Sequence, residues 1–139
     1  MSKRIAIVHD ALVVPAGSER VALYISNVFP NAPIYTSVYL PESTFPEFKG
    51  KKIYTLPFSS MIKNERQFKG LFPWWYVGFS FLDLSQYDIV ISSANYLAKY
   101  ITPPSFTTHI CYLHNPVRFL WRQILIAAKV FHMDVQVLP

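Results

Sequence analysis

Polar side chains follow three apolar, strand-like runs of this sequence, each at the point where the run ends. The residues concerned are His9 and Asp10 after residues 4–8, Ser92 and Ser93 at the end of residues 87–93, and His114 and Asn115 after residues 109–113. An imidazole at such a position titrates near neutral pH and can donate to a negative charge that develops during a reaction. His114 is therefore the candidate reacting side chain, and an ordinary turn histidine is the alternative.

A loop containing Gly17 joins the first of these runs to a predicted helix. The unpaired N–H groups and the positive dipole end of a helix start suit a phosphate, and Gly17 would let the backbone approach it closely. Ser18 is the expected N-cap, and Glu19 in the first turn either complements the dipole or belongs to the site. The spacing matches neither the G-x-G-x-x-G fingerprint nor a P-loop, so a simple tight turn is the alternative.

His109, Cys111 and His114 superficially suggest a metal site. Side chains alternate between the two faces of a strand, so His109 and Cys111 share one face and His114 lies on the other. No further pair has metal-ligand spacing, so we expect no bound metal. Cys111 is expected to be an inert core residue rather than a nucleophile.

The elements that would position these residues alternate between strands and helices. The pattern predicts strands at residues 4–8, 32–40, 52–56, 87–93 and 109–113, and helices at residues 18–29, 59–69 and 74–82, with a further helix starting at Pro116. Such alternation is typical of an open, mostly parallel α/β sheet with helices on both faces. With the strand order 3-2-1-4-5, ligands bind at the carboxyl edge between the first and fourth strands.

Composition fits a single compact domain. The 139 residues are 52% hydrophobic, and the single cysteine cannot form an internal disulfide. No secretory signal is visible, and the apolar run at residues 70–82 is too short to span a bilayer. Because a single cysteine does not require an oxidising compartment, we expect a cytoplasmic protein. No nucleic-acid motif accompanies the net charge of +5, so we expect no binding of nucleic acid.

The aromatic run at residues 68–84 has two interpretations. Its apolar side chains recur every three to four residues, which predicts a helix packed on the core. Alternatively, the run lies at a lipid surface beside basic residues, and the protein sits peripherally at the inner membrane face. The residues are Phe72, Trp75, Phe79 and Leu82 for the core, and Trp74, Trp75 and Tyr76, beside Lys63, Arg66 and Lys69, for the lipid surface.

Four ordered segments of the chain resemble one known pattern: IAIVHDALVVPAGSERV, FPNAPIYTSVY, LDLSQYDIVISSA and CYLHNPVRFLW. In these segments the chain is similar to the N-terminal, Rossmann-like domain of family 4 glycosyltransferases. Enzymes of that family have two such domains facing each other across a cleft, the GT-B architecture. The resemblance covers residues 3–122 and implies that domain at residues 1–122. The chain is expected to depart from the family in a truncated or divergent tail at residues 123–139 and in the absence of the C-terminal donor-binding domain.

The resemblance implies retaining transfer of a sugar from a nucleotide-sugar donor to a glycan or lipid-linked acceptor, with no metal and no other cofactor. His114 matches a histidine near the donor sugar and the departing phosphate. Ala16 and Gly17 match a Gly-Gly turn whose N–H groups meet the donor diphosphate, with Glu19 following it, and Ala16 replaces the first glycine. The residues expected on the acceptor side are Asp10, His9, Ser93 and Arg118.

Other functions are compatible with the same residues. Donor specificity in this family belongs to the C-terminal domain, so the chain is expected to transfer sugar poorly or not at all by itself. The alternative is a non-catalytic single domain that binds a sugar, a lipid-linked acceptor or a nucleotide. A third interpretation is an inactive fragment that associates through an exposed interdomain face. The acceptor could be a lipopolysaccharide, an exopolysaccharide or a lipid.

Overall fold

Five parallel strands form the central sheet, in the order β3-β2-β1-β4-β5 that the sequence predicted. The computed structural model describes residues 2–115 of the chain. The strands are β1 (Ile5–His9), β2 (Ile34–Thr36), β3 (Ile53–Thr55), β4 (Ile89–Ala94) and β5 (Thr108–Leu113). Because all five run in the same direction, their carboxyl ends share one edge of the sheet.

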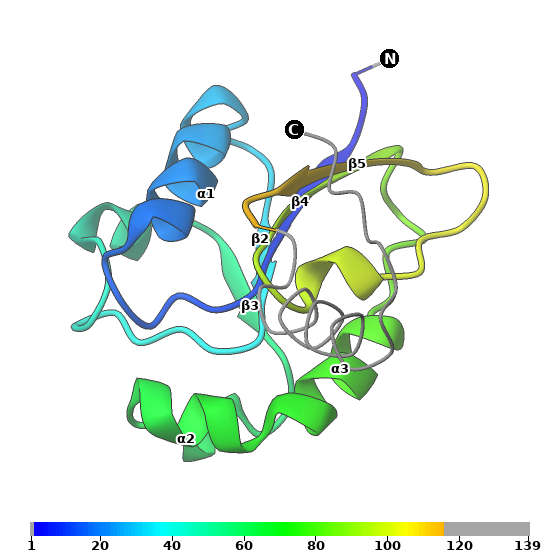
Figure 1. Cartoon of the computed structure of the whole chain (residues 1–139). Coiled ribbons are helices and arrows are strands. Elements are labelled where there is room, and N and C mark those ends of the chain that lie inside the picture. The colour runs from blue at the N-terminus through cyan, green and yellow to red at the C-terminus, as the bar shows by residue number, and fades with distance from the viewer. Residues whose placement is uncertain (1, 116–139) are drawn as a thin grey trace, which may run out of the picture.

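Helices cover both faces of the sheet (Figure 1). The helix α1 (Gly17–Val28) packs on one face, and α2 (Glu65–Gly70) and α3 (Phe72–Ser80) pack on the other. Side chains alternate along β1, so Ala6 and Val8 join the core beneath α2 and α3, whereas Ile7 joins the core beneath α1. We call these two sides the α3 face and the α1 face. A sheet covered on both sides explains why β1 is a continuous apolar run.

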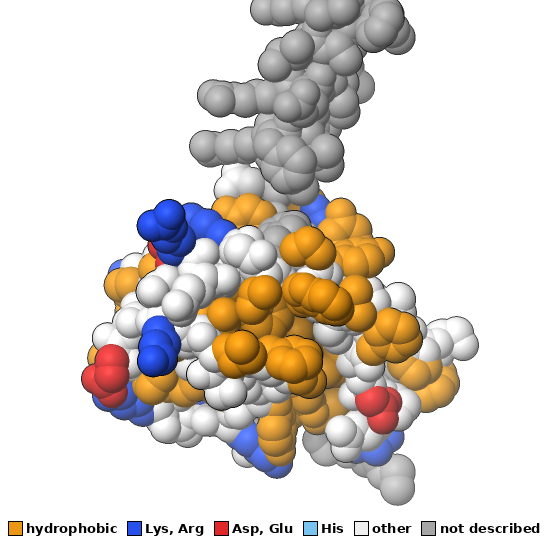
Figure 2. Space-filling view, turned by 90° about the horizontal axis from the view of Figure 1, so that it is seen from below, with side chains coloured by type: hydrophobic (Ala, Val, Ile, Leu, Met, Phe, Trp, Pro, Cys, Tyr) orange, Lys and Arg blue, Asp and Glu red, His pale blue; other side chains and the backbone are white. Residues whose placement is uncertain are grey.

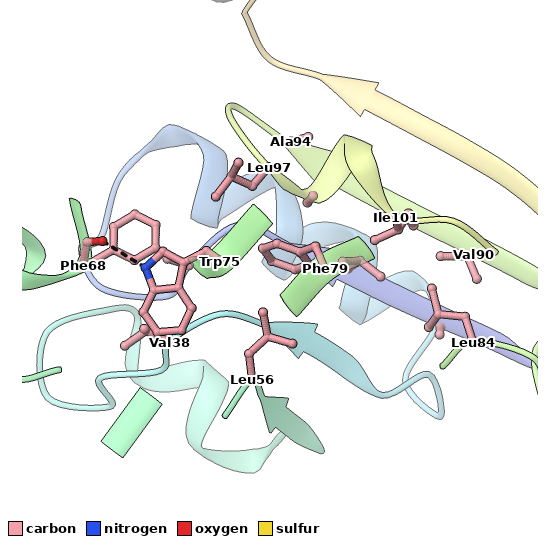
Figure 3. Packing of buried hydrophobic residues seen from close by; sticks show 14 of the residues in the cluster. Val38, Leu56, Phe68, Trp75, Phe79, Leu84, Val90, Ala94, Leu97 and Ile101 are labelled. Atoms are coloured by element: carbon pink, nitrogen blue, oxygen red, sulfur yellow. Dashed lines mark hydrogen bonds between the residues drawn. The ribbon is translucent and has the colours of Figure 1, made fainter. Parts of the chain in front are cut away.

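The helix α3 anchors the core of its face through two aromatic side chains (Figure 3). Trp75 and Phe79 are buried, and Trp75 Nε1 donates a hydrogen bond to the carbonyl oxygen of Phe68, 2.9 Å away. The core interpretation is therefore confirmed for these two residues, and the prediction that Trp75 lies at a lipid surface is wrong. Its neighbour Trp74 points to solvent and is 65% exposed.

The predicted helix at residues 59–69 is instead two short helices. A 3₁₀ helix, η2 (Ser59–Met61), precedes α2, and the extended residue Asn64 separates them. The side chain of Asn64 accepts a hydrogen bond from the backbone N–H of Gln67 at 3.0 Å, so Asn64 caps a new helix. Two other 3₁₀ helices are η1 (Pro46–Gly50) and η3 (Ala98–Tyr100).

The second strand is shorter than the predicted 32–40. After Thr36 the chain leaves the ladder, and pairing resumes only at an isolated parallel bridge between Leu12 and Tyr39. The N–H of Ser37 donates to the carbonyl oxygen of Asp10, so this segment follows the loop after β1 rather than the sheet. The helix predicted from Pro116 and the tail at residues 123–139 lie outside the described residues.

The chain leaves the central strand β1 in one direction and returns to its other side. From β1 it passes through α1 to β2 and β3, and then through α2 and α3 to β4 on the opposite side of β1. Connections therefore diverge from the carboxyl ends of β1 and β4, which opens a crevice at that edge of the sheet.

Candidate functional site

Three of the predicted site residues meet at this edge. The register pairs His9 of β1 with Ser93 of β4, and the backbone N–H of His114, just after β5, donates to the carbonyl oxygen of Ala94 at 3.0 Å. Because His9 pairs with Ser93 and both alternate with residues of the α3 face, their side chains lie on the α1 face. The predicted strand order had placed these residues at one edge, and the pairing of β1 with β4 brings His9 and Ser93 into contact.

The hydroxyl of Ser93 lies between two imidazole rings. His9 Nδ1 is 2.9 Å from the carbonyl oxygen of Ser93 and 3.2 Å from its Oγ. The same Oγ is 2.7 Å from Nε2 of His114. His9 and Ser93 are buried and His114 is half-buried. We call this arrangement the His–Ser–His chain.

The partners of these atoms fix where the protons lie. A carbonyl oxygen only accepts hydrogen bonds, so His9 Nδ1 carries a proton and donates it towards Ser93. The Ser93 hydroxyl can donate its single proton to Nε2 of His114 in the tautomer that leaves this nitrogen unprotonated, and we assign that tautomer to the neutral ring. His114 therefore has its proton on Nδ1, and this N–H is the donor that the ring can offer to a ligand.

The surroundings of His114 favour its neutral form. Burial lowers the pKa of this imidazole below its ordinary value, the nearby His9 lowers it further, and the carboxylate of Asp10 acts in the opposite direction. The neutral form of the ring is thus favoured near neutral pH. The stability that this group contributes is present above the ordinary histidine pKa and is lost as the pH falls through the lowered value.

One atom of the His–Ser–His chain has no hydrogen-bond partner in the described part of the protein. His9 Nε2 is buried, and no group in residues 2–115 forms a hydrogen bond with it. Buried polar atoms are nearly always paired, and each exception calls for an explanation. Because Nδ1 of the same ring carries the proton, Nε2 is free to accept a hydrogen bond from a ligand.

Asp10 has a structural task at this edge. Its Oδ2 accepts hydrogen bonds from the N–H groups of Asn95 (2.5 Å) and Tyr96 (2.9 Å), and its Oδ1 accepts from Leu97 and Ala98 (2.7 Å each). The buried carboxylate thus binds the turn that leads from β4 into η3. Contact with an acceptor remains a prediction for this residue.

A cavity of about 500 Å³ opens beside Asp10. Its walls come from the loop after β1, from α2 and from the turn after β4, and its polar lining residues are Asp10, Ser18, Glu19, Glu65, Lys69 and Asn95. The ammonium of Lys69 is 2.8 Å from Glu65, so the carboxylates of Asp10 and Glu19 dominate the remaining charge. Carboxylates accept hydrogen bonds, so this lining suits a ligand rich in hydroxyl groups.

The loop before α1 differs from its prediction. The helix begins at Gly17, and the extended residue Ala16 is its N-cap without a side-chain hydrogen bond. Ser18 is therefore not the cap, and its hydroxyl donates to Glu19 at 2.8 Å. Gly17 has no positive φ, and an added Cβ would meet nothing within 4 Å. The glycine is therefore not required by a tight turn, and open space lies in front of the uncapped helix start.

Two residues of β5 lie apart from this site. His109 Nε2 is 2.8 Å from Ser92 Oγ, and the alternation along β4 places Ser92 on the α3 face, opposite to Ser93. Cys111 is exposed, so its predicted place in the core is wrong, because the described residues leave much of this edge strand uncovered. Within residues 2–115 no three potential metal ligands come together. Arg118 lies outside the described residues.

The sequence did not predict the far wall of the cavity. Glu65 and Lys69 come from α2, and Asn95 from the turn after β4, and nothing in their spacing connects them to the loop after β1. They meet there because α2 packs against the same edge. The one signal in the sequence was Asn95 itself, a polar residue two positions after the strand predicted at residues 87–93.

Replacing Asp10 with Asn tests the structural task of its carboxylate. The amide would turn an NH₂ group towards two of the four N–H donors, and each buried donor left unpaired costs about 1–3 kcal/mol. We expect the free energy of unfolding in urea to fall by at least about 2 kcal/mol. The matched control Asp83→Asn changes an exposed carboxylate that accepts from one N–H, that of Ser85, and should have a much smaller effect. Equal losses would contradict the structural task.

The proton positions in the His–Ser–His chain can be read from ¹⁵N shifts of the imidazole rings. We expect neutral His114 to carry its proton on Nδ1 and to titrate below the ordinary histidine pKa. Ser93→Ala removes the donor to Nε2 and should move the proton towards Nε2. Ser92→Ala, which lies on the other face beside His109, should leave the signals of His114 unchanged. A wild-type His114 protonated on Nε2 would refute the assignment.

Comparison with known proteins adds no relative to this description. The chain matches no protein-family model, no curated protein and no solved structure at a significant level. Its fold is that of a single Rossmann-like α/β domain with a five-stranded parallel sheet.

Proposed function

We propose that this chain forms the N-terminal, acceptor-side domain of a retaining glycosyltransferase that takes its sugar from a nucleotide-sugar donor. The observation that carries the proposal is the His–Ser–His chain at the crevice edge, with a cavity lined by carboxylates beside it. Four ordered sequence motifs resemble the same domain of family 4 enzymes, and they include these residues.

The cavity is the place for the acceptor. Hydroxyl groups of a glycan or lipid-linked sugar donate to the carboxylate of Glu19, while the side chain of Asn95 can donate and accept. His9 does not line the cavity, but its Nε2, which has no hydrogen-bond partner within residues 2–115, is a further acceptor at the same edge. This lining favours a polyol over a phosphate as the ligand of the cavity itself.

His114 acts on the leaving group. During transfer, the bond between the anomeric carbon and the diphosphate breaks, the acceptor oxygen bonds to that carbon, and the proton of the acceptor hydroxyl passes to an oxygen of the departing diphosphate. The diphosphate leaves with the electron pair, so negative charge grows on its oxygen. The Nδ1–H of a neutral imidazole held by Ser93 can donate to that charge without reorganising. The uncapped N–H groups at Ala16 and Gly17 serve the same anion.

One observation favours a second candidate, a non-catalytic domain that binds a sugar or nucleotide. The carboxylate of Asp10 already accepts four backbone hydrogen bonds and is poorly placed to take a proton from an acceptor. Binding without transfer would need only the cavity.

A transfer assay on the native protein separates the two. Radiolabelled UDP-glucose, UDP-galactose and GDP-mannose are supplied with a lipid extract, and label in the lipid and polymer fractions is counted. We expect His114→Ala to lower turnover about tenfold or more, since it removes a donor to the developing charge.

The matched control is His109→Ala. This histidine also bonds to a serine of β4, but the pair lies on the opposite face. Turnover should stay near that of the wild type. Unchanged turnover in His114→Ala would refute its role, and saturable donor or acceptor binding without any transfer would favour the binding domain.

A further inference from the structure

The helix α3 is apolar on both of its sides. Residues Phe72–Ser80 contain no charged side chain. Trp75 and Phe79 face the core, whereas Trp74 is 65% exposed and Val77 on the same outer side is 44% exposed. A helix that is apolar all round is normally buried on all sides, in a core or in contact with lipid. The outer side of α3 is therefore exposed, although its apolar sequence is typical of a side that is buried in a core or in lipid.

An apolar groove extends from α3 across the segment that precedes it (Figure 2). Its volume is about 550 Å³, and every residue that lines it is apolar. We call its most exposed part the apolar surface, formed by Phe58, Met61, Trp74, Val77 and Phe81. Scattered apolar side chains are common on proteins, but a continuous patch indicates an interaction site.

The backbone at Phe58 holds an aromatic ring in this surface. Its φ of 70° is the one positive value among non-glycine residues in the part of the chain that the structure describes. A bulky side chain in the left-handed region costs on the order of 1–3 kcal/mol, and such strain concentrates at functional sites. Here it accompanies a ring that is 65% exposed and contributes little to the core.

Positive charge borders the apolar surface. Lys63 and Arg66 follow Met61 closely in sequence, both are exposed, and neither forms an ion pair within residues 2–115. The acidic neighbour Glu65 is bound by Lys69 at 2.8 Å. The helices α2 and α3 lie along the same side of the molecule (Figure 1). Lys63 is two residues from Met61 of the apolar surface, and Arg66 is on α2, directly before α3 in the chain.

We propose that the apolar surface docks on an anionic lipid bilayer. Its aromatic and aliphatic side chains enter the boundary between headgroups and acyl chains, while Lys63 and Arg66 contact lipid phosphates. The contact is peripheral: among the described residues, no helix is long and apolar enough to cross a membrane. A second copy of the chain fits less well, because a two-fold interface here would bring the unpaired cations of both copies together. This inference does not depend on the proposed transfer reaction.

Co-sedimentation of the 139-residue chain with vesicles tests the proposal. We expect binding to vesicles of phosphatidylcholine mixed with phosphatidylglycerol, weaker binding to phosphatidylcholine alone, and a loss of binding with added salt. The fluorescence of exposed Trp74 should shift to the blue on binding. Absence of binding to the anionic vesicles would overturn the proposal.

Substitutions locate the contact. Trp74→Ser and Phe81→Ser should each weaken vesicle affinity about tenfold, because each removes a large apolar side chain from lipid. Tyr24→Ser is the matched control, since Tyr24 is 58% exposed but lies on α1, on the other face. Equal affinity in Trp74→Ser, Phe81→Ser and the control would overturn the assignment of the surface.

A variant that changes only exposed charges tests the contact without disturbing the fold. Lys63→Gln with Arg66→Gln leaves the core untouched and should weaken binding to anionic vesicles by on the order of tenfold, with no effect on neutral ones. Sedimentation equilibrium without lipid tests the alternative that a second copy of the chain occupies the apolar surface. A dimer that Trp74→Ser dissociates would show that a second copy covers this surface and would overturn the lipid proposal.

Discussion

The buried carboxylate of Asp10 holds the functional edge of this molecule together. It follows the central strand β1 and accepts four backbone hydrogen bonds from the turn after β4. These hydrogen bonds fix the ends of β1 and β4 to each other at the edge where their onward connections diverge and the crevice opens. His9 directly precedes Asp10, and Ser93 precedes the turn that Asp10 binds. The distance between the side chains of His9 and Ser93 therefore depends on the hydrogen bonds of Asp10.

Side-chain alternation separates two similar pairs on the two faces of the sheet. Each pair joins a histidine of β5, or just after it, to a serine of β4, at 2.8 Å for His109 and 2.7 Å for His114. Only the second pair meets His9, which carries the proton needed to orient the Ser93 hydroxyl. The difference between an isolated pair and a connected chain therefore comes from the register of β1 with β4. The helix α2 connects this edge to the rest of the surface, because it forms one wall of the cavity and its C-cap residue Leu71 lines the apolar groove.

The arrangement of the sheet was predictable from the sequence, because β1 and β4 are apolar runs too continuous for a half-exposed strand. The edge at which His9, Ser93 and His114 meet followed from the strand order. Their hydrogen bonds did not, since a register is set by backbone pairing that sequence patterns leave open. The uncapped start of α1 and the exposure of Cys111 were also missed, because both depend on what packs nearby. The core interpretation of the aromatic run is confirmed for Trp75 and Phe79 on the inner side of α3, and the lipid interpretation stays a prediction for its exposed side. Periodicity alone could not separate the two sides.

The central claim is that the His–Ser–His chain faces the ligand. Imidazole ¹⁵N and ¹H signals of the native protein, followed during titration with UDP-glucose, GDP-mannose and simple methyl glycosides, test it most directly. The account predicts that signals of His9 and His114 shift together with at least one of these ligands while His109 stays unchanged. Shifts confined to His109, or saturable binding that moves neither His9 nor His114, would contradict it.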